Sequence, residues 1–379
     1  MRVLVDGRVD GADGIGRYTR SVIAALRGSN SSDVEVTVLR PGSARRYSRA
    51  EGIELLSCAA GSRADLVHTL DYRVPVTPAV EITTIVTVHD VLRVVRPDLC
   101  YFDADFVIRF GKEGLADLSE VVADLREVAA FPVRRAPAGL HEEYLGRMLA
   151  LGISRAECVI TPTVTVARQL CDVVPAGDKL RVSSWGVDHL PSVTDLPRAS
   201  VPGPYLLYVG QARPHKGLPA LLAAVPRTVI YGEGASLALV GRDFESDSSA
   251  ARMAVDALGA HRVLPLGVVP DAVLTALYAH ATALVHLADH EGFGFPPLEA
   301  LALGCPVVAS DIPVLRETLG PHAAFADPGN PDDVADRVDH VVATDGPAVR
   351  AERIRWAQRF RWQRHVGDLL DCYRQLVLP

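Results

Sequence analysis

The chain has 379 residues, which is enough for two or three domains that each bury a core. Its 39 lysines and arginines against 46 aspartates and glutamates give a net charge of −7, which excludes the basic field of a nucleic-acid-binding protein. The hydrophobic fraction of 49% is ordinary for an α/β protein, and no apolar run approaches the roughly 20 residues that a membrane-spanning helix needs.

Three further features of the sequence are informative. The six cysteines are scattered and form no C-x-x-C pair, which is typical of a reduced, cytoplasmic protein. The first six residues have the pattern of a strand rather than of a signal peptide, so we expect a cytoplasmic location. Three of the 39 basic residues are lysines, namely Lys112, Lys179 and Lys216, so a lysine in a turn is a stronger sign of function than usual.

Residues 1–190 alternate short apolar stretches with helical segments, which predicts a parallel, doubly wound α/β sheet. The expected strands are 3–5, 34–39, 66–68, 84–88 and 158–161. A glycine-rich loop with Gly14 and Gly16 follows the first strand, and a helix is expected over 18–26. Such a loop can bind phosphate through its backbone amides. Its length and Thr19 exclude a dinucleotide fingerprint, and taken alone a plain tight turn is the simpler explanation.

The strand 84–88 leads to His89 and Asp90. Ligands of open α/β sheets bind outside the carboxyl ends of the strands, so we expect His89 to face that crevice as a catalytic candidate. A purely structural histidine is the alternative. Asp90 would either orient the imidazole or cap the following turn.

A proline-rich stretch, 191–204, lacks a periodic apolar face and predicts a linker. It separates a first domain, 1–190, from a second one, 205–360. Residues 361–379 are expected to form a last helix whose apolar residues recur at helical spacing and dock elsewhere.

The second domain begins with a strand that ends at Gly210, followed by a turn that holds Arg213 and Lys216. Another turn, 267–270, contains Val268 and follows a later strand. The other expected strands are 237–240, 263–266, 282–287, 307–309 and 323–326.

The stretch 290–306 places two carboxylates, Glu291 and Glu299, on either side of a glycine turn and a helix start. The backbone amides of the turn converge at the helix N-terminus and form a cradle for anions or hydroxyls. Inside the helix, Glu299 can accept hydrogen bonds from two neighbouring hydroxyls at once. A solvated acidic turn is the alternative.

This Glu-x7-Glu spacing, with glycines and prolines between, resembles the donor-binding motif of family-4 glycosyltransferases of the GT-B fold. The flanks 271–280 and 307–319, the turn 211–217 and the loop 14–18 resemble the same family. The resemblance implies two Rossmann-like domains that face a central cleft, with the last helix crossing back to the first domain. It also implies a retaining transferase that uses a nucleoside-diphosphate sugar.

The resemblance assigns roles in the second domain. Glu299 would accept the ribose hydroxyls of the donor, while Glu291 would hold the sugar hydroxyls. The diphosphate would be neutralised by Lys216 and Arg213, so no metal ion or other cofactor is expected to be required. The remaining donor-binding candidates are Gly14, Gly16, Gly210, Gly292, Phe293, Gly294, Phe295 and, beside the nucleobase, Val268.

Two parts of the chain depart from the family pattern. Many members have an arginine where this chain has Gln211, and we expect Arg213 to supply that charge. The resemblance fades over 98–140, where the segment 113–139 is an extra helical piece over the acceptor side, a dimer contact or a surface insertion. Asp103-Ala104-Asp105 imitates the D-x-D metal motif of the other large glycosyltransferase fold. It follows no buried strand, so we expect no metal there.

We therefore expect a bacterial retaining hexosyltransferase that acts on a hydroxyl of a small-molecule (natural-product) or saccharide acceptor. One alternative is a GT-B pseudo-glycosyltransferase that couples a nucleotide-activated cyclitol. A polysaccharide or lipopolysaccharide mannosyltransferase and an inactive scaffold subunit are the others. The expected partners are the donor and the acceptor, with at most peripheral membrane contact, no nucleic acid, and a homodimer as one option.

Overall fold

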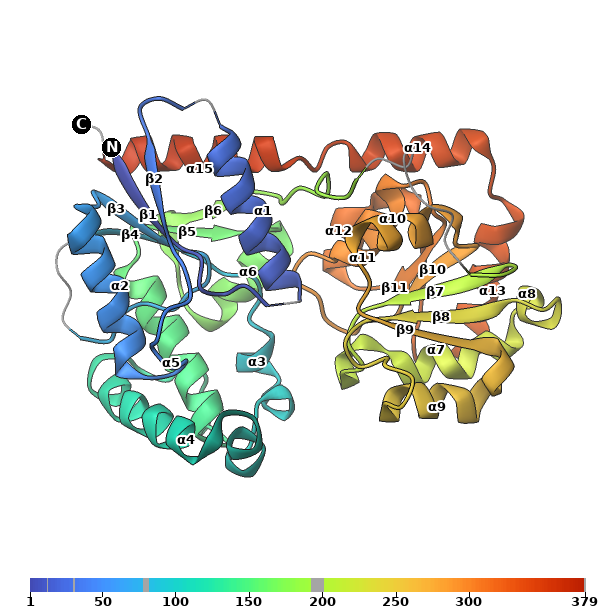
Figure 1. Ribbon diagram of the computed structural model, residues 1–379, viewed down its shortest axis with the longest axis horizontal. Helices are drawn as coiled ribbons and strands as arrows, with labels where there is room; N and C mark the ends of the chain where they lie inside the picture. The colour runs from blue at the N-terminus through green and yellow to red at the C-terminus, as the bar shows by residue number, and fades with distance from the viewer. Residues whose placement is uncertain (12, 30, 78–81, 192–200, 378–379) are drawn as a thin grey trace. The chain divides into compact units, whose positions relative to one another are not determined.

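The computed structural model describes residues 1–11, 13–29, 31–77, 82–191 and 201–377 (Figure 1). The chain divides into two compact units, which are residues 1–185 with 362–379, and residues 186–361. Each unit contains a six-stranded sheet whose described strand pairs are all parallel, so the expected two-domain α/β fold is confirmed. Most of the expected linker, namely 192–200, lies outside the described residues.

The first unit has the sheet order β2-β1-β3-β4-β5-β6, which reverses its direction of winding between β1 and β3. Its strands are β1 (Arg2–Asp6), β2 (Glu35–Leu39), β3 (Leu66–Thr69), β4 (Thr83–Thr87), β5 (Cys158–Thr161) and β6 (Leu180–Val182). Its helices are α1 (Gly14–Gly28), α2 (Arg49–Ser62), α3 (Leu92–Val95), α4 (Asp103–Val128), α5 (Leu140–Arg155), α6 (Val164–Val173) and α15 (Trp362–Val377).

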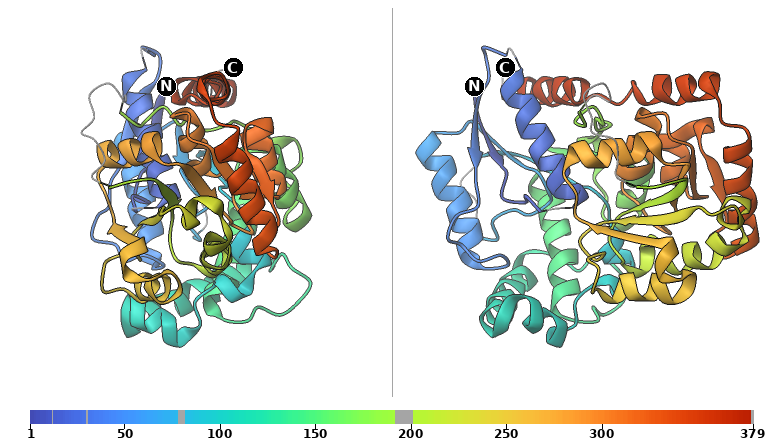
Figure 2. Two further views of the ribbon diagram at one scale, coloured as in Figure 1. Left: turned by 90° about the vertical axis from the view of Figure 1, so that its right-hand side faces the viewer. Right: turned by 45° about the vertical axis from the view of Figure 1, so that its right-hand side comes forward.

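The two faces of the first sheet carry different helices. Successive side chains of a strand point to opposite faces, so alternate residues enter different cores. Val86 and Val159 pack with α4 and α5 in one core. On the other face His68 contacts Tyr373 of α15, which lies beside α1 (Figure 2). The last helix of the chain therefore completes the first unit.

Two local expectations for this unit need correction. Helix α1 begins at Gly14 rather than at residue 18, because the Asp13 side chain caps it by accepting from the Gly16 amide at 3.0 Å. The short edge strand β6 was not expected, since its three residues form no buried apolar run. The region after residue 98 contains the long helix α4, which Gly111 interrupts with a non-helical backbone (φ 77°).

The second unit has the sheet order β12-β11-β10-β7-β8-β9. Its strands are β7 (Tyr205–Val209), β8 (Ser236–Val240), β9 (Val263–Gly267), β10 (Ala283–His286), β11 (Val307–Ser310) and β12 (Ala324–Ala326). Its helices are α7 (Leu218–Ala224), α8 (Val229–Gly232), α9 (Ser249–Leu258), α10 (Asp271–His280), α11 (Phe295–Ala302), α12 (Pro313–Leu319), α13 (Pro331–Ala343) and α14 (Pro347–Ala357). Read from β7 as the first strand, this is the Rossmann order 3-2-1-4-5-6, whose switch point lies between β7 and β10.

Within the described part of the chain, no helix has both the length and the apolar character that a membrane crossing requires.

Candidate functional site

The switch point of the second sheet brings together two loops that are far apart in the sequence. The loop after β7 contains the 3-10 turn Pro214–Lys216, and the Asp289 amide of the loop after β10 donates to His215 O at 2.9 Å. Gly217 has a left-handed backbone (φ 70°), and a Cβ there would lie 2.0 Å from Leu287 O. The two loops thus pack backbone against backbone, which a side chain at residue 217 would prevent.

A buried ionic cluster lies where these loops meet. Lys216 Nζ donates to Glu291 Oε1 at 2.6 Å, and His286 Nε2 contacts the same oxygen at 2.8 Å. The side chain of Glu291 is 10% exposed, that of Lys216 22% and that of His286 3%. Burial alone would raise the pKa of Glu291, but the Lys216 charge and the His286 hydrogen bond outweigh it and hold that pKa well below its usual range. Glu291 is therefore a fixed carboxylate at neutral pH.

Two histidines next to this cluster in the sequence have buried ring nitrogens. Burial, together with the nearby Lys216 charge, lowers the pKa of His215 to about 4, so its ring is neutral. Among the described residues, His215 Nδ1 and His290 Nε2 have no hydrogen-bond partner. Buried polar atoms of this kind are normally satisfied, so both are candidates for contact with water or with a hydroxylated ligand.

Helix α11 starts directly after the glycine turn. Gly294 occupies its N-cap with a left-handed backbone (φ 83°), and no side chain of the described residues caps this helix start. The rings of Phe293 and Phe295 are buried, lie 5.2 Å apart between centroids, and Phe293 also packs on Phe360. The two phenylalanine rings thus anchor the turn in the core, as the backbone-amide interpretation of this stretch requires.

Glu299 lies inside α11 and is 2% exposed. The Tyr278 hydroxyl donates to its Oε2 at 2.9 Å, and His189 Nε2 contacts its Oε1 at 2.9 Å. Each oxygen of a carboxylate can accept more than one hydrogen bond. The two contacts fix the orientation of the carboxylate.

Gln211 is the departure from the family pattern, and its side chain holds Arg213, the residue that was expected to supply the missing charge. Arg213 Nε donates to Gln211 Oε1 at 2.6 Å, and the Tyr208 hydroxyl donates to Gln211 O at 2.9 Å. The guanidinium of Arg213 is therefore oriented by the turn that carries it. A Cβ at Gly241 would lie 1.8 Å from Gly210 O, so the ends of β7 and β8 are also in close contact.

The other candidates lie at the edges of this region or in the first unit. Val268, which follows β9, has an exposed side chain. Gly14 and Gly16 open α1, and a Cβ at Gly16 would lie 1.8 Å from Gly11 O. The Gly16 amide already donates a hydrogen bond to the Asp13 side chain.

His89 is enclosed by the first unit. Its Nε2 lies 2.7 Å from Leu70 O, and its ring packs on Tyr18 and Trp185. Burial lowers its pKa, so the ring is neutral. Its Nδ1 has no hydrogen-bond partner among the described residues, and a catalytic role for His89 stays a prediction. Asp90 caps the following turn by accepting from the Leu92 amide at 2.8 Å.

In the described ranges, no group of three or more histidine, cysteine or acidic side chains is arranged to hold a metal ion. Asp103 and Asp105 lie in the exposed first turn of α4.

Three residues of the site were not predicted from the sequence: His286, His189 and Tyr278. His286 ends a predicted strand at the carboxyl edge of the sheet, so the strand-end rule that singled out His89 points to it as well. His189 precedes the proline-rich stretch, and Tyr278 sits within an ordinary amphipathic helix. Neither of these two carries a sequence signal that would connect it with Glu299.

Residues 198–359 match the family model described as "Glycosyl transferases group 1". The matched residues make up most of the second unit, residues 186–361. The match ends close to the boundary of the unit and includes every member of the cluster around Glu291. It also includes Glu299 and its partner Tyr278, but not His189.

Curated relatives match about half of the chain. The O-antigen chain mannosyltransferase RfbU of Salmonella typhimurium is 29% identical over 195 residues, which cover 51% of this chain and 52% of the relative. A GDP-mannose:cellobiosyl-diphosphopolyprenol alpha-mannosyltransferase of Xanthomonas oryzae pv. oryzae is 29% identical over 240 residues, 62% of this chain and 61% of the relative. The chain spans about half the length of the first curated relatives it matches.

Solved structures resemble the whole chain. Sucrose-phosphate synthase from Thermosynechococcus elongatus superposes with a TM-score of 0.69 at 19% identity and 99% coverage of both chains. Alr3699/HepE of Anabaena, in complex with UDP and glucose, gives a TM-score of 0.67 at 15% identity, covering 99% of this chain and all of its own. At these identities the likeness shows the GT-B fold.

Proposed function

We propose that this protein is a retaining family-4 glycosyltransferase, which moves a hexose from a nucleoside-diphosphate sugar to a hydroxyl of its acceptor. The observation that supports this most is the cluster of Lys216, His286 and Glu291 at the switch point of the second sheet. A fixed cation beside a fixed carboxylate suits a substrate that has a diphosphate on one side and sugar hydroxyls on the other.

The donor would occupy both charges of the cluster. Lys216, with Arg213 held by Gln211, would neutralise the diphosphate as it leaves, and no metal ion would then be required. Lys216 and His286 both contact Oε1 of Glu291, so Oε2 would accept the sugar hydroxyls. The amides of 292–295 would contribute to the same subsite.

The nucleoside would bind next to this subsite. Glu299 would accept the ribose hydroxyls, because a carboxylate is an acceptor that can take two neighbouring hydroxyl donors at once. Val268 would border the base, and Gly210 would border the diphosphate. Retention follows if the leaving phosphate takes the acceptor proton on the same face, a route that requires no protein base.

Mannose is the hexose we propose to test first, because curated relatives of the chain are named as mannosyltransferases and one name specifies GDP-mannose. Their names also mention O-antigen and diphosphopolyprenol-linked saccharides, so a saccharide acceptor has more support than a natural-product aglycone. Coupling of a nucleotide-activated cyclitol and an inactive scaffold are the competing functions.

The test is to incubate the protein with GDP-mannose, or with UDP-glucose in parallel, and a set of saccharide and small-molecule acceptors. Release of the nucleoside diphosphate and the anomer of any product would be measured by chromatography and NMR. We expect transfer that keeps the anomeric configuration of the donor and that Lys216→Gln abolishes. An inverted product would contradict the retaining mechanism, whereas a non-sugar product would favour the cyclitol alternative.

A further inference from the structure

Three arginines of the first unit have aromatic rings, rather than acidic side chains, as partners. Arg46 Cζ lies 5.1 Å from the centre of the Tyr47 ring. Arg93 Cζ and Arg109 Cζ lie 5.8 Å and 5.5 Å from the centre of the Tyr101 ring. In the described part of the chain, none of the three guanidinium groups forms a hydrogen bond or an ion pair.

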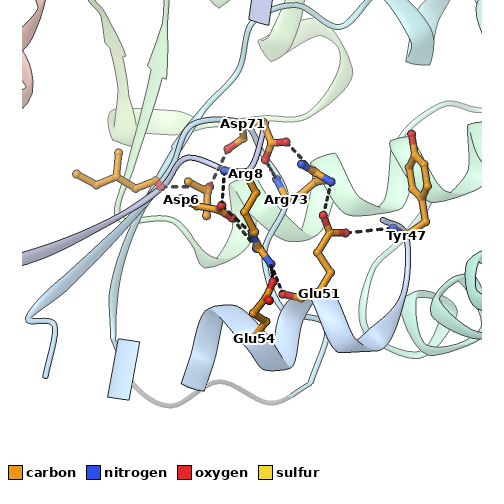
Figure 3. A network of polar contacts seen from close by, with 9 residues as sticks. Asp6, Arg8, Tyr47, Glu51, Glu54, Asp71 and Arg73 are labelled. Carbon is orange, nitrogen blue, oxygen red and sulfur yellow. Dashed lines mark hydrogen bonds and ion pairs between the residues drawn. The ribbon is translucent and has the colours of Figure 1, made fainter. Parts of the chain in front are cut away.

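Other arginines of this unit are neutralised by carboxylates. Arg8 and Arg73 belong to a largely buried network in which each forms two ion pairs (Figure 3). Arg45, which directly precedes the first of the three arginines, pairs with two carboxylates of α4 at 2.7 Å each. Asp90 attracts Arg93 through space but forms no ion pair with it. The three ring-bound arginines are therefore cations without a close counter-charge in the described residues.

The rings beneath these cations form one cluster. The Tyr47 ring lies 5.2 Å from that of Phe110 and 5.6 Å from that of His141, between centroids. Tyr101 lies 5.0 Å from His141 and 6.0 Å from Phe110. The three guanidinium groups thus lie on one group of rings, although they come from the segment before α2, from α3 and from α4. Stacking on a ring orients a guanidinium and leaves its N–H edges available to an anion.

His141 of α5 adds a hydrogen-bond donor to the same cluster. Its Nδ1 accepts from the Tyr101 amide at 3.1 Å. Burial, with the charges of Arg93 and Arg46, lowers the pKa of His141 to about 3, so the ring is neutral and carries its proton on Nε2. This Nε2 is buried and has no partner among the described residues. Buried donors are normally satisfied, so we expect an oxygen from outside the protein to complete it.

Tyr47 enters the cluster with a strained backbone. Its φ of 68° lies in the left-handed region, which is rare for a bulky side chain. The Tyr47 amide donates to Glu51 Oε2 at 3.1 Å (Figure 3), and the ring packs on Phe106 and Tyr144. Such strain persists only where the surroundings enforce it, and it is concentrated at ligand-binding sites.

We propose that Arg46, Arg93 and Arg109 form a binding site for the phosphate group of a ligand. A guanidinium offers parallel N–H donors that match phosphate oxygens, and several unpaired cations suit a phosphate better than a single carboxylate. Arg46 and Arg109 are exposed and Arg93 is half-buried, so the site is open to solvent. The proposal rests on the first unit alone and does not depend on the proposed transfer reaction.

The experiment treats the folded full chain with phenylglyoxal, which modifies accessible guanidinium groups, and maps the modified arginines by peptide mass spectrometry. The probes are inorganic phosphate and glucose 6-phosphate, with glucose as the unphosphorylated control. We expect both phosphates to protect Arg46 and Arg109 and glucose to protect neither, while Arg45 reacts equally throughout. Because each arginine is measured separately, protection of Arg213 in the proposed donor site is distinguished from protection here.

A second arm distinguishes a soluble ester from a lipid headgroup as the source of the phosphate. Phe102 and Ile108 are 56% and 85% exposed on the same segment, so vesicles of phosphatidylglycerol are compared with vesicles of phosphatidylcholine. Protection by phosphatidylglycerol vesicles, without protection by the soluble phosphates, would identify the headgroup as the source.

Two matched variants test whether the protection is specific. Arg109→Gln should raise the probe concentration that half-protects Arg46 about ten- to a hundredfold, as expected for the loss of a hydrogen bond to a charged group. Arg45→Gln removes the same charge from a paired arginine nearby and should leave that concentration unchanged. Equal effects of the two variants, or no protection of Arg46 and Arg109 by any probe, would overturn the proposal.

Discussion

Lys216 Nζ lies 2.6 Å from Glu291 Oε1, and this contact joins the loops that follow two neighbouring strands of the second sheet. Removing one member of a largely buried ion pair leaves the other uncompensated, which costs about 3–5 kcal/mol. Lys216 is partly exposed, so the lower end of that range applies.

We therefore expect Lys216→Met to lower the unfolding free energy of the second unit by about 3 kcal/mol. The double variant Lys216→Met with Glu291→Leu should recover much of this loss, because no charge is then left buried. Urea denaturation of both single variants and the double variant gives the coupling energy. Additive losses would mean that the contact does not act as a pair.

His286 is expected to act by positioning Glu291. Replacing it with leucine removes a hydrogen bond to a charged group, which is worth about 1.5–3 kcal/mol. If that loss falls on the transition state, kcat/KM decreases about ten- to a hundredfold. His286→Gln retains a donor and should recover part of the rate. Equal losses in the leucine and glutamine variants would indicate a role other than this hydrogen bond.

Gly217 is expected to be irreplaceable in the second unit. Gly217→Ala would combine a left-handed backbone with a Cβ that lies 2.0 Å from Leu287 O. We expect a loss of more than about 2 kcal/mol in unfolding free energy, measured by urea denaturation. Gly232→Ala in α8 is the matched control, since a Cβ there meets nothing within 4 Å. Similar stability of the two variants would show that the loops can separate.

Buried neutral histidines make the first unit sensitive to mild acid. Burial lowers the pKa of His68 and of His365 to about 3 from the ordinary value of 6.5. As the pH falls, these two histidines therefore bind protons in the unfolded chain before they do so in the folded one. The stability that they contribute is fully present above pH 6.5 and is lost between pH 6.5 and 3. Each histidine contributes a slope of about 1.4 kcal/mol per pH unit in that window.

Urea midpoints measured from pH 8 to pH 4.5 check this expectation. His365→Gln should be less stable than the wild type at pH 8, because His365 contacts Tyr18 and Ser183, but its stability should fall less steeply with acid. An unchanged slope would mean that His365 does not titrate on unfolding. Glu291 contributes in a different window: its lowered pKa gives stability that is lost only below about pH 4.5, as the carboxylate becomes protonated.

Much of the fold could be predicted because parallel strands buried on both faces read as short apolar runs. The strand 158–161 was predicted with its observed bounds, and the others differ by one or two residues. The edge strand β6 was not predicted because its side chains are largely exposed. The start of α1 was placed too late because glycines weaken a helical pattern, whereas Asp13 as N-cap sets the boundary.

The site was less predictable than the fold. Spacing and glycines singled out Glu291, Glu299 and Lys216, but contacts between distant segments decide their partners. His189 and Glu299 are 110 residues apart, and no local pattern links them. The Gln211–Arg213 bond is local, yet its geometry depends on a turn that Tyr208 holds from the strand below.

The most direct measurement is calorimetric binding of GDP, UDP, ADP and dTDP to the wild type and to Glu299→Ala. If the second unit is a working donor site, one diphosphate binds, and the variant loses about ten- to a hundredfold in affinity as the hydrogen bonds to a charged carboxylate disappear. Circular dichroism of Glu299→Ala would establish that the variant is folded. Undiminished nucleotide affinity in the folded variant, or no binding of any diphosphate to the wild type at millimolar concentration, would contradict the proposed donor site.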